Sequence, residues 1–215
     1  MTAPSQPPIA SSSTEPRLSP REAGLSALFL LSGAAALAYQ LCWQRMLSFS
    51  FGTDIESITI TVSAFMLGLG LGALLGGGIA DRRPGAIVGF FAAFELGIGL
   101  FGLASIELVP LVGESFSLHS RAAGAAAVFL LMLLPTALMG ATLPMLIAHF
   151  FRIQGNVGVS TGLLYFFNTL GAGAGATLVG FVAFNFITLK EVAALAACVN
   201  FTVAAGGLAL MRAAR

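Results

Sequence analysis

The sequence predicts an all-α polytopic membrane protein with six transmembrane helices. Of its 215 residues, 57% are hydrophobic and only 9% are charged, whereas an average soluble domain carries about 25% charged residues. The few charges separate long stretches that reach the ~20 residues needed for a helix to cross a ~30 Å hydrocarbon core. These stretches are apolar at both odd and even positions, which favours helices over the alternating strands of a membrane β-barrel.

One transmembrane domain is expected over 23–212, preceded by a cytoplasmic tail. Residues 1–22 are expected to be disordered, because the first twenty residues hold five of the nine prolines and a Ser/Thr run and cannot bury a core. The helices are expected at 23–47, 57–80, 86–108, 123–148, 160–184 and 190–211. Charged residues or helix breakers mark their limits: Arg45 lies near the end of the first, Lys190 begins the sixth, and the runs 81–85 and 152–155 fall between helices.

The basic residues predict the orientation of the chain. One side of the membrane receives seven of them and the other side three, so the positive-inside rule places both termini in the cytoplasm. We therefore expect a multi-pass protein of the cell's inner (cytoplasmic) membrane, with Trp43 and Arg45 as an interfacial anchor pair at the outer end. The seven are Arg17, Arg21, Arg82, Arg83, Arg152, Arg212 and Arg215, and the three are Arg45, Arg121 and Lys190.

Composition argues against several classes of function. The net charge is only +1 and no basic patch is present, so nucleic acid is not an expected partner. Cys42 and Cys198 lie inside apolar segments, while His119 and His149 are far apart, so neither a metal site nor a cofactor is expected. Six crossings leave little chain for a soluble catalytic domain, and no catalytic residue is predicted.

Glycines recur at helical spacing in the second and fifth segments. Each segment lacks the strand and acidic residue of a dinucleotide-binding loop, so the glycines are expected to pack helices closely together. The two sets are offset by 103 residues, about half of the chain, and the segments run in opposite directions. A 3+3 inverted repeat, a common plan of secondary transporters, is one explanation, and chance similarity is the other. The predicted packing residues are Gly68, Gly72, Gly76, Gly171 and Gly175.

Glu95 is the ionisable residue deepest inside a span. It lies nine residues into the third segment, about 14 Å deep, and Asn200 lies about 15 Å deep in the sixth, so the two side chains could meet near the midplane. A carboxyl group there is costly and indicates a functional site by default. The alternative is structural: a protonated Glu95, with interhelical hydrogen bonds for the other polar residues. The substrate-binding candidates are Glu95, Asn200, Gln40, Asn168 and Tyr165.

Two further motifs concern the shape of the bundle. Pro135 and Pro144 flank Gly140 in the fourth segment and either form a hinge or simply kink the helix. Asp81 and Arg82 end the second segment in a tight charged turn. This turn partly resembles the loop 2–3 signature of major facilitator transporters, and the six segments would then form half of such a bundle.

Residues 39–47 read YQLCWQRML. This string resembles the first-helix motif of a more specific family, the membrane spermidine-synthase-like proteins, also called fused major-facilitator/spermidine-synthase proteins. Further similar stretches are 64–68 through Asp81 and Arg82, 95–100, 135–144, Leu164 with Tyr165, and 168–172. The resemblance covers about residues 25–211. Gln40 departs from it, because the family usually has Glu at this position.

The resemblance implies a function in the membrane rather than catalysis. The family usually continues into a soluble aminopropyltransferase domain, of which this sequence contains nothing, so the chain is not expected to be an enzyme by itself. The first hypothesis is a scaffold or anchor for a separate synthase-like partner. The alternatives are a transporter of small solutes, such as polyamines, that works as a homodimer in the lipid bilayer, and a structural subunit of a larger membrane complex.

Overall fold

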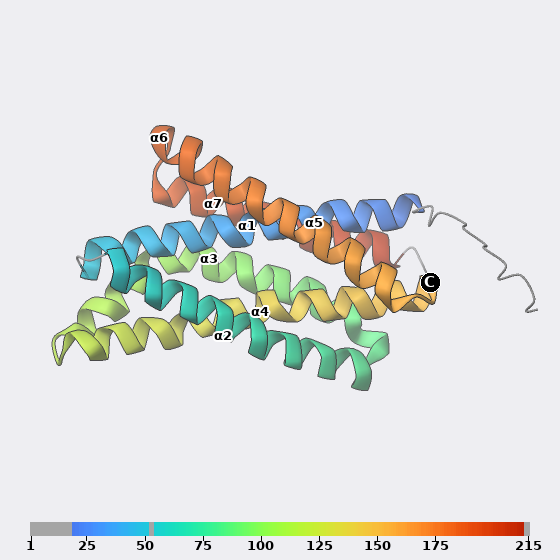
Figure 1. Cartoon of the computed structure of the whole chain (residues 1–215), viewed down its shortest axis with the longest axis horizontal. Coiled ribbons are helices and arrows are strands. Elements are labelled where there is room, and N and C mark those ends of the chain that lie inside the picture. Colours follow the sequence, from blue (N-terminus) through green and yellow to red (C-terminus); the bar gives the residue numbers. More distant parts are fainter. Residues whose placement is uncertain (1–18, 52–53, 213–215) are drawn as a thin grey trace, which may run out of the picture.

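The computed structural model describes residues 19–51 and 54–212 and confirms the expected fold class (Figure 1). These residues form helices and short connections, with no strand among them. Six spans are long and apolar enough to cross a membrane. The helices are α1 (Pro20–Phe51), α2 (Asp54–Arg82), α3 (Ile87–Ser117), α4 (Arg121–Gln154), α5 (Val157–Thr177), α6 (Phe184–Phe186) and α7 (Leu189–Arg212). A 3₁₀ turn, η1 (Pro84–Ala86), precedes α3.

The first helix begins earlier than the sequence pattern indicated. Ser19 and Glu22 form a reciprocal cap, in which the Ser19 N–H donates to Glu22 Oε2 (2.8 Å) and the Glu22 N–H donates to Ser19 Oγ (3.3 Å). Pro20 follows the cap as the first helical residue, where its missing N–H costs nothing. The helix therefore starts three residues before the expected position 23. The rest of the expected tail, including Arg17, lies outside the described residues, as does Arg215.

The other helices also extend beyond the minimal spans. α3 continues through Pro110 to Ser117, past the expected end at 108. α4 starts where Ser120 caps the N–H of Ala123 (3.1 Å), and it ends at Gly155, which has a left-handed φ of 70°. The fifth span runs from α5 into a π-helical turn, η2 (Leu178–Ala183), and then α6. The sequence pattern gave no sign of this π-helical turn.

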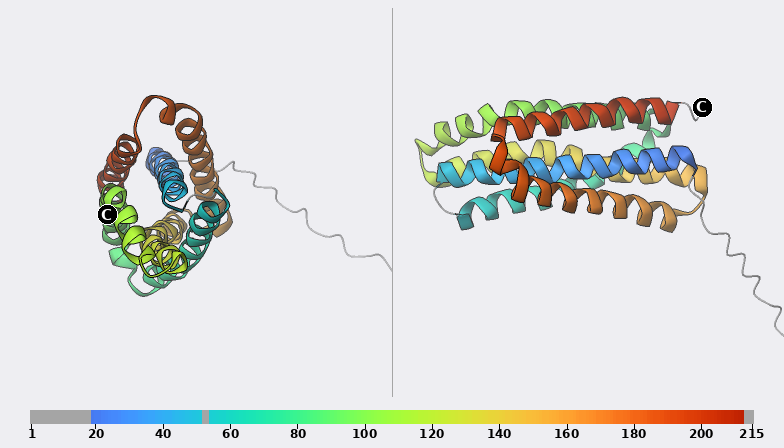
Figure 2. Two further views of the ribbon diagram at one scale, coloured as in Figure 1. Left: turned by 90° about the vertical axis from the view of Figure 1, so that its left-hand side faces the viewer. Right: turned by 90° about the horizontal axis from the view of Figure 1, so that it is seen from above.

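The helices form one bundle with two distinct sides. In the end-on and top views, α2 and α5 lie on one side, α3 and α7 lie on the opposite side, and α1 runs between them (Figure 2). α2 packs on α4, α5 packs on α1, and α3 packs on both α4 and α7. Both ends of the described chain lie at the same end of the bundle (Figure 2). The assignment of that end to the cytoplasm stays a prediction.

Trp43 occupies the core rather than the membrane interface. Its side chain is fully buried. Its ring centroid lies 5.7 Å from that of Tyr39 and 5.8 Å from that of Phe101, whose ring is nearly perpendicular to it. The expectation of an interfacial anchor pair was therefore wrong for this residue. α1 continues past Trp43 to Phe51, so Trp43 lies two turns inside the helix, while Arg45 is exposed and lies 4.8 Å from the Phe184 ring.

Candidate functional site

Glu95 lies in a closed polar cluster between α1, α3 and α7. The hydroxyl of Ser32 on α1 donates to Glu95 Oε1 (2.8 Å), and the side-chain amide of Asn200 on α7 donates to Glu95 Oε2 (2.7 Å). The exposed fractions of Glu95 and Asn200 are 0% and 1%. Both carboxyl oxygens are thus occupied by neutral donors of the bundle itself, and three helices are joined at one point.

Small residues on α3 allow these short side chains to reach one another. Gly99 and Gly102 lie one and two turns after Glu95 on the same helix face. A Cβ atom at Gly99 would lie 2.6 Å from the Phe201 ring of α7, and one at Gly102 would overlap the Tyr39 ring of α1. The absence of side chains at these two glycines therefore allows α7 and α1 to pack closely against α3.

A second polar contact joins α1 and α3. The Trp43 indole N–H donates to Ser105 Oγ (2.8 Å), and the Ser105 hydroxyl lies 2.8 Å from the Gly102 carbonyl oxygen, to which it donates. Ser32, Trp43 and Ser105 were not among the predicted site residues. Serines are too common in apolar helices to stand out, and Ser105 lies about 80° around α3 from Glu95 at 3.6 residues per turn, so spacing alone gave no signal for it.

The cluster holds acceptors that are not used within the described part of the chain. Asn200 Oδ1 and the Tyr39 hydroxyl are buried without a hydrogen-bond partner there. No basic side chain is hydrogen-bonded to Glu95, and the described residues contain no group of three or more His, Cys, Asp or Glu that could hold a metal ion. The arrangement joins three helices through side chains that are buried in the bundle.

The structure brings together two of the five substrate-binding candidates. Glu95 and Asn200 are hydrogen-bonded, whereas Tyr165 is 60% exposed on the outside of α5. Asn168 packs against the backbone of Gly33 at the contact between α5 and α1, and Gln40 is half-buried on α1. The five side chains therefore do not surround a single enclosed site.

The glycine motifs lie at two backbone-to-backbone contacts. On α2, Gly68 and Gly76 face Thr136 and Ala141 of α4, and on α5, Gly171 faces the Leu30 carbonyl of α1. A Cβ atom at any of these three glycines would overlap the opposite helix. The glycines allow α2 to approach α4, and α5 to approach α1, more closely than larger residues permit.

One contact between α2 and α4 has a counterpart between α5 and α1 at equivalent positions of the two halves of the chain. Gly72 of α2 faces the backbone of Ala137 in α4, and Gly175 of α5 faces the backbone of Ala34 in α1. Gly175 follows Gly72 by 103 residues, and Ala137 follows Ala34 by the same 103 residues. A 3+3 inverted repeat requires contacts related in this way.

The proline-flanked segment and the loop between α2 and α3 both lie at helix contacts. α4 remains one helix over 34 residues with Pro135 and Pro144 inside it, and Gly140 faces the backbone of Leu69 in α2.

Asp81 and Arg82 are exposed at the end of α2. Arg152, at the end of α4, donates to the carbonyl oxygens of Pro84 (3.0 Å) and Ala80 (3.3 Å) and so fixes the loop.

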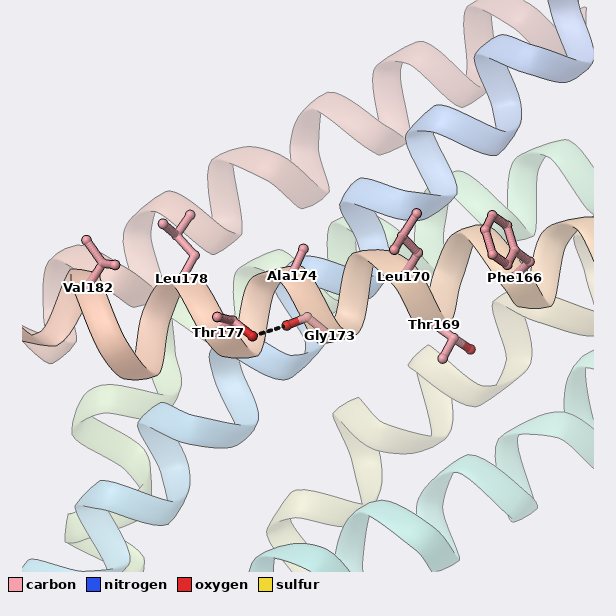
Figure 3. A pocket seen from close by; sticks show the side chains of 8 residues that line it. All are labelled: Phe166, Thr169, Leu170, Gly173, Ala174, Thr177, Leu178 and Val182. Carbon is pink, nitrogen blue, oxygen red and sulfur yellow. Dashed lines mark hydrogen bonds between the residues drawn. The ribbon is translucent and has the colours of Figure 1, made fainter.

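The α5 groove is an open apolar surface on the outside of the bundle (Figure 3). All of its lining residues come from α5 and η2, and the Thr177 hydroxyl donates to the Gly173 carbonyl oxygen there (2.8 Å). In an apolar stretch of 18 residues within this span, only 17% of the residues are buried inside the bundle. The corresponding share is 28% for α2 and 33–50% for the other spans. The lining residues are Phe166, Thr169, Leu170, Gly173, Ala174, Thr177, Leu178 and Val182.

Fold and side-chain contacts together define an all-α polytopic membrane protein with six transmembrane helices. No family model, curated protein or solved structure matches the chain. Its function is therefore argued from its own residues.

Proposed function

We propose that the chain is a non-catalytic membrane module that scaffolds or anchors a separate synthase-like protein. The resemblance of residues 39–47 and 135–144 to membrane spermidine-synthase-like proteins supports the kind of partner. The exposure of α5 supports the mode of binding. In this proposal the partner places a transmembrane or membrane-associated helix in the α5 groove.

The observation that carries the proposal is the row of small and polar residues on the least buried span. Thr169, Gly173 and Thr177 recur every four residues and are exposed on one face of α5. Space in front of Gly173 is open, because a Cβ atom built there has no neighbour within 4 Å. Small residues and threonines at this spacing allow a second helix to approach closely and to form hydrogen bonds in lipid.

The closed cluster around Glu95 supports a structural module rather than a solute site within one copy. A substrate-binding carboxylate must exchange its partners with a ligand, whereas Glu95 is fully buried and bonded to Ser32 and Asn200. The cluster also lies among α1, α3 and α7, on the other side of α1 from the α5 groove.

Affinity purification in mild detergent, followed by mass spectrometry, tests the proposal. The tagged chain should recover a synthase-like protein, and Gly173→Leu should abolish the recovery because leucine fills the α5 groove without touching this bundle. Gly89→Leu is the matched control, because Gly89 on α3 also has open space before it and lies on the opposite side. Recovery of the partner by both variants, or by neither, contradicts the proposed surface. Recovery of a complex without any synthase-like protein favours a structural subunit instead.

A second candidate is a transporter of small solutes, such as polyamines, assembled from two copies. The exchanged contacts of Gly72 with Ala137 and of Gly175 with Ala34 favour it, since inverted repeats are a common plan of secondary transporters. Two copies joined through α2 and α5 would give twelve helices. Polyamine uptake by proteoliposomes, reduced by Glu95→Gln and accompanied by a dimer in crosslinking, supports this candidate. A monomer without uptake removes it.

A further inference from the structure

The two ends of the bundle differ in how their basic residues are neutralised. At one end, Arg121 pairs with Glu56 (2.7 Å) and Lys190 pairs with Glu107 (2.6 Å), while Arg45 lies over the Phe184 ring. The opposite end carries four exposed arginines for which the described part of the chain provides no ion pair. They are Arg21, Arg82, Arg83 and Arg212. Four exposed arginines therefore gather at the end where the described part of the chain begins and ends, with Asp81 as the exposed carboxylate beside Arg82.

A groove of mixed polar and apolar lining lies at this end. There α7 finishes beside the start of α3 (Figure 2). Its volume is about 450 Å³. Apolar side chains of α3 and the guanidinium-bearing side chain of Arg212 line it together; the lining residues are Gly85, Ala86, Val88, Gly89, Phe90, Ala93 and Arg212. Gly89 leaves the groove open, because a Cβ atom at this position has no neighbour within 4 Å. We call it the α3–α7 groove.

The chemistry of the α3–α7 groove limits what can occupy it. The walls require an apolar chain, while the guanidinium of Arg212 requires an anion that accepts hydrogen bonds, for which phosphate oxygens are well suited. Arg82 and Arg83 lie just before η1 and α3 in the chain, so they add positive potential near the rim. A ligand with both an anionic phosphate and a long apolar tail meets every requirement.

We propose that the α3–α7 groove binds an anionic phospholipid, with the phosphate at Arg212 and an acyl chain along α3. Basic pockets between helices on the cytoplasmic side of membrane proteins commonly bind such headgroups, and the basic end is the one predicted to be cytoplasmic. A zwitterionic lipid is disfavoured because its own cation opposes the positive charge at the rim. The proposal is independent of the scaffold function.

Native mass spectrometry of the full chain, with phosphatidylglycerol and phosphatidylcholine supplied in equal amounts, tests the site. The unmodified protein should retain phosphatidylglycerol preferentially. Arg212→Gln should lower this retention about five-fold, the effect of about one basic residue near an anionic surface. Gly89→Leu should lower it at least as much, because its side chain fills the groove while every charge remains.

Two control variants separate a built site from general attraction to the basic end. Arg21→Gln removes an exposed charge at the same end but outside the α3–α7 groove, and Gly162→Leu adds the same side chain at an open position of α5. Both should retain phosphatidylglycerol within two-fold of the unmodified protein. Circular dichroism checks that all four variants fold.

Several results would overturn the proposal. An equal loss of retention in Arg21→Gln and Arg212→Gln would show attraction to the whole basic end. Full retention by folded Gly89→Leu would place the lipid elsewhere. Displacement of the lipid by inorganic phosphate at millimolar concentration would show a site for a free anion, and equal retention of the two lipids would show no site at all.

Discussion

Replacing Glu95 with alanine removes the acceptor that Ser32 and Asn200 share, and this variant tests the structural role of the cluster. Two interhelical hydrogen bonds are lost, each contributing about 0.6–1.7 kcal/mol in membrane proteins. The Asn200 amide is also left buried with neither end bonded, which costs about 1–3 kcal/mol. We expect Glu95→Ala to lower the free energy of unfolding by about 3 kcal/mol.

Glu95→Gln is the matched control, because glutamine keeps the length and shape of the side chain. Its carbonyl oxygen can accept from the Asn200 amide, and its own amide can donate to the Ser32 hydroxyl oxygen, so both bridges remain. The loss should be below about 1 kcal/mol. Titration with sodium dodecyl sulfate in mixed micelles, followed by the fluorescence of the single tryptophan, Trp43, measures both variants.

Two results would refute this explanation. A loss below about 0.5 kcal/mol for Glu95→Ala, the range of ordinary surface substitutions, would mean that the two hydrogen bonds do not stabilise the fold. Equal losses for alanine and glutamine would mean that the carboxyl group itself is required, and a functional role for Glu95 would then be favoured.

Three further outcomes are expected from the same structure. Gly171→Leu should destabilise the bundle by at least about 2 kcal/mol, because the new side chain would overlap the Leu30 carbonyl and overpacking has this cost. Gly173 lies two residues away and has open space before it. Gly173→Leu should therefore change the free energy of unfolding by less than about 0.5 kcal/mol in the same detergent titration. The emission of Trp43 should be at short wavelength and insensitive to iodide, since the ring is fully buried; strong quenching would restore an interfacial position. A maleimide that cannot cross the membrane should label His119→Cys in spheroplasts but label Arg83→Cys only after lysis, and the reverse pattern would invert the predicted orientation.

Hydropathy predicted the six spans because lipid imposes one strong rule: each crossing must be apolar and internally hydrogen-bonded. The ends were less predictable, since they depend on caps such as Ser19 with Glu22 and Gly155. The π-helical turn after Thr177 left no sequence signal. Such a turn depends on which backbone carbonyl each N–H reaches, and hydropathy does not report it.

The polar residues could be ranked by depth but not by direction. Depth along the helices placed Glu95 and Asn200 at one level, and the structure joins them through a 2.7 Å hydrogen bond. Tyr165 was a candidate only because it is a polar residue inside a span, and it lies on the outer face of α5. Trp43 was misplaced for a related reason, because aromatic residues near a helix end resemble interfacial anchors until the true length of the helix is known.

Under the proposed scaffold function, the cluster and the α5 groove would have separate tasks, because they lie on opposite sides of α1. A solute that entered from the α5 side would have to pass α1 to reach Glu95, and α1 is held against α5 by backbone contacts at Gly171 and Gly175. We therefore expect stability and partner binding to respond to different substitutions. Glu95→Ala should weaken the bundle while the folded fraction still captures its partner, and Gly173→Leu should abolish capture at unchanged stability. Loss of both properties in either variant would show that one surface serves both tasks, and the separation argued from the fold would be wrong.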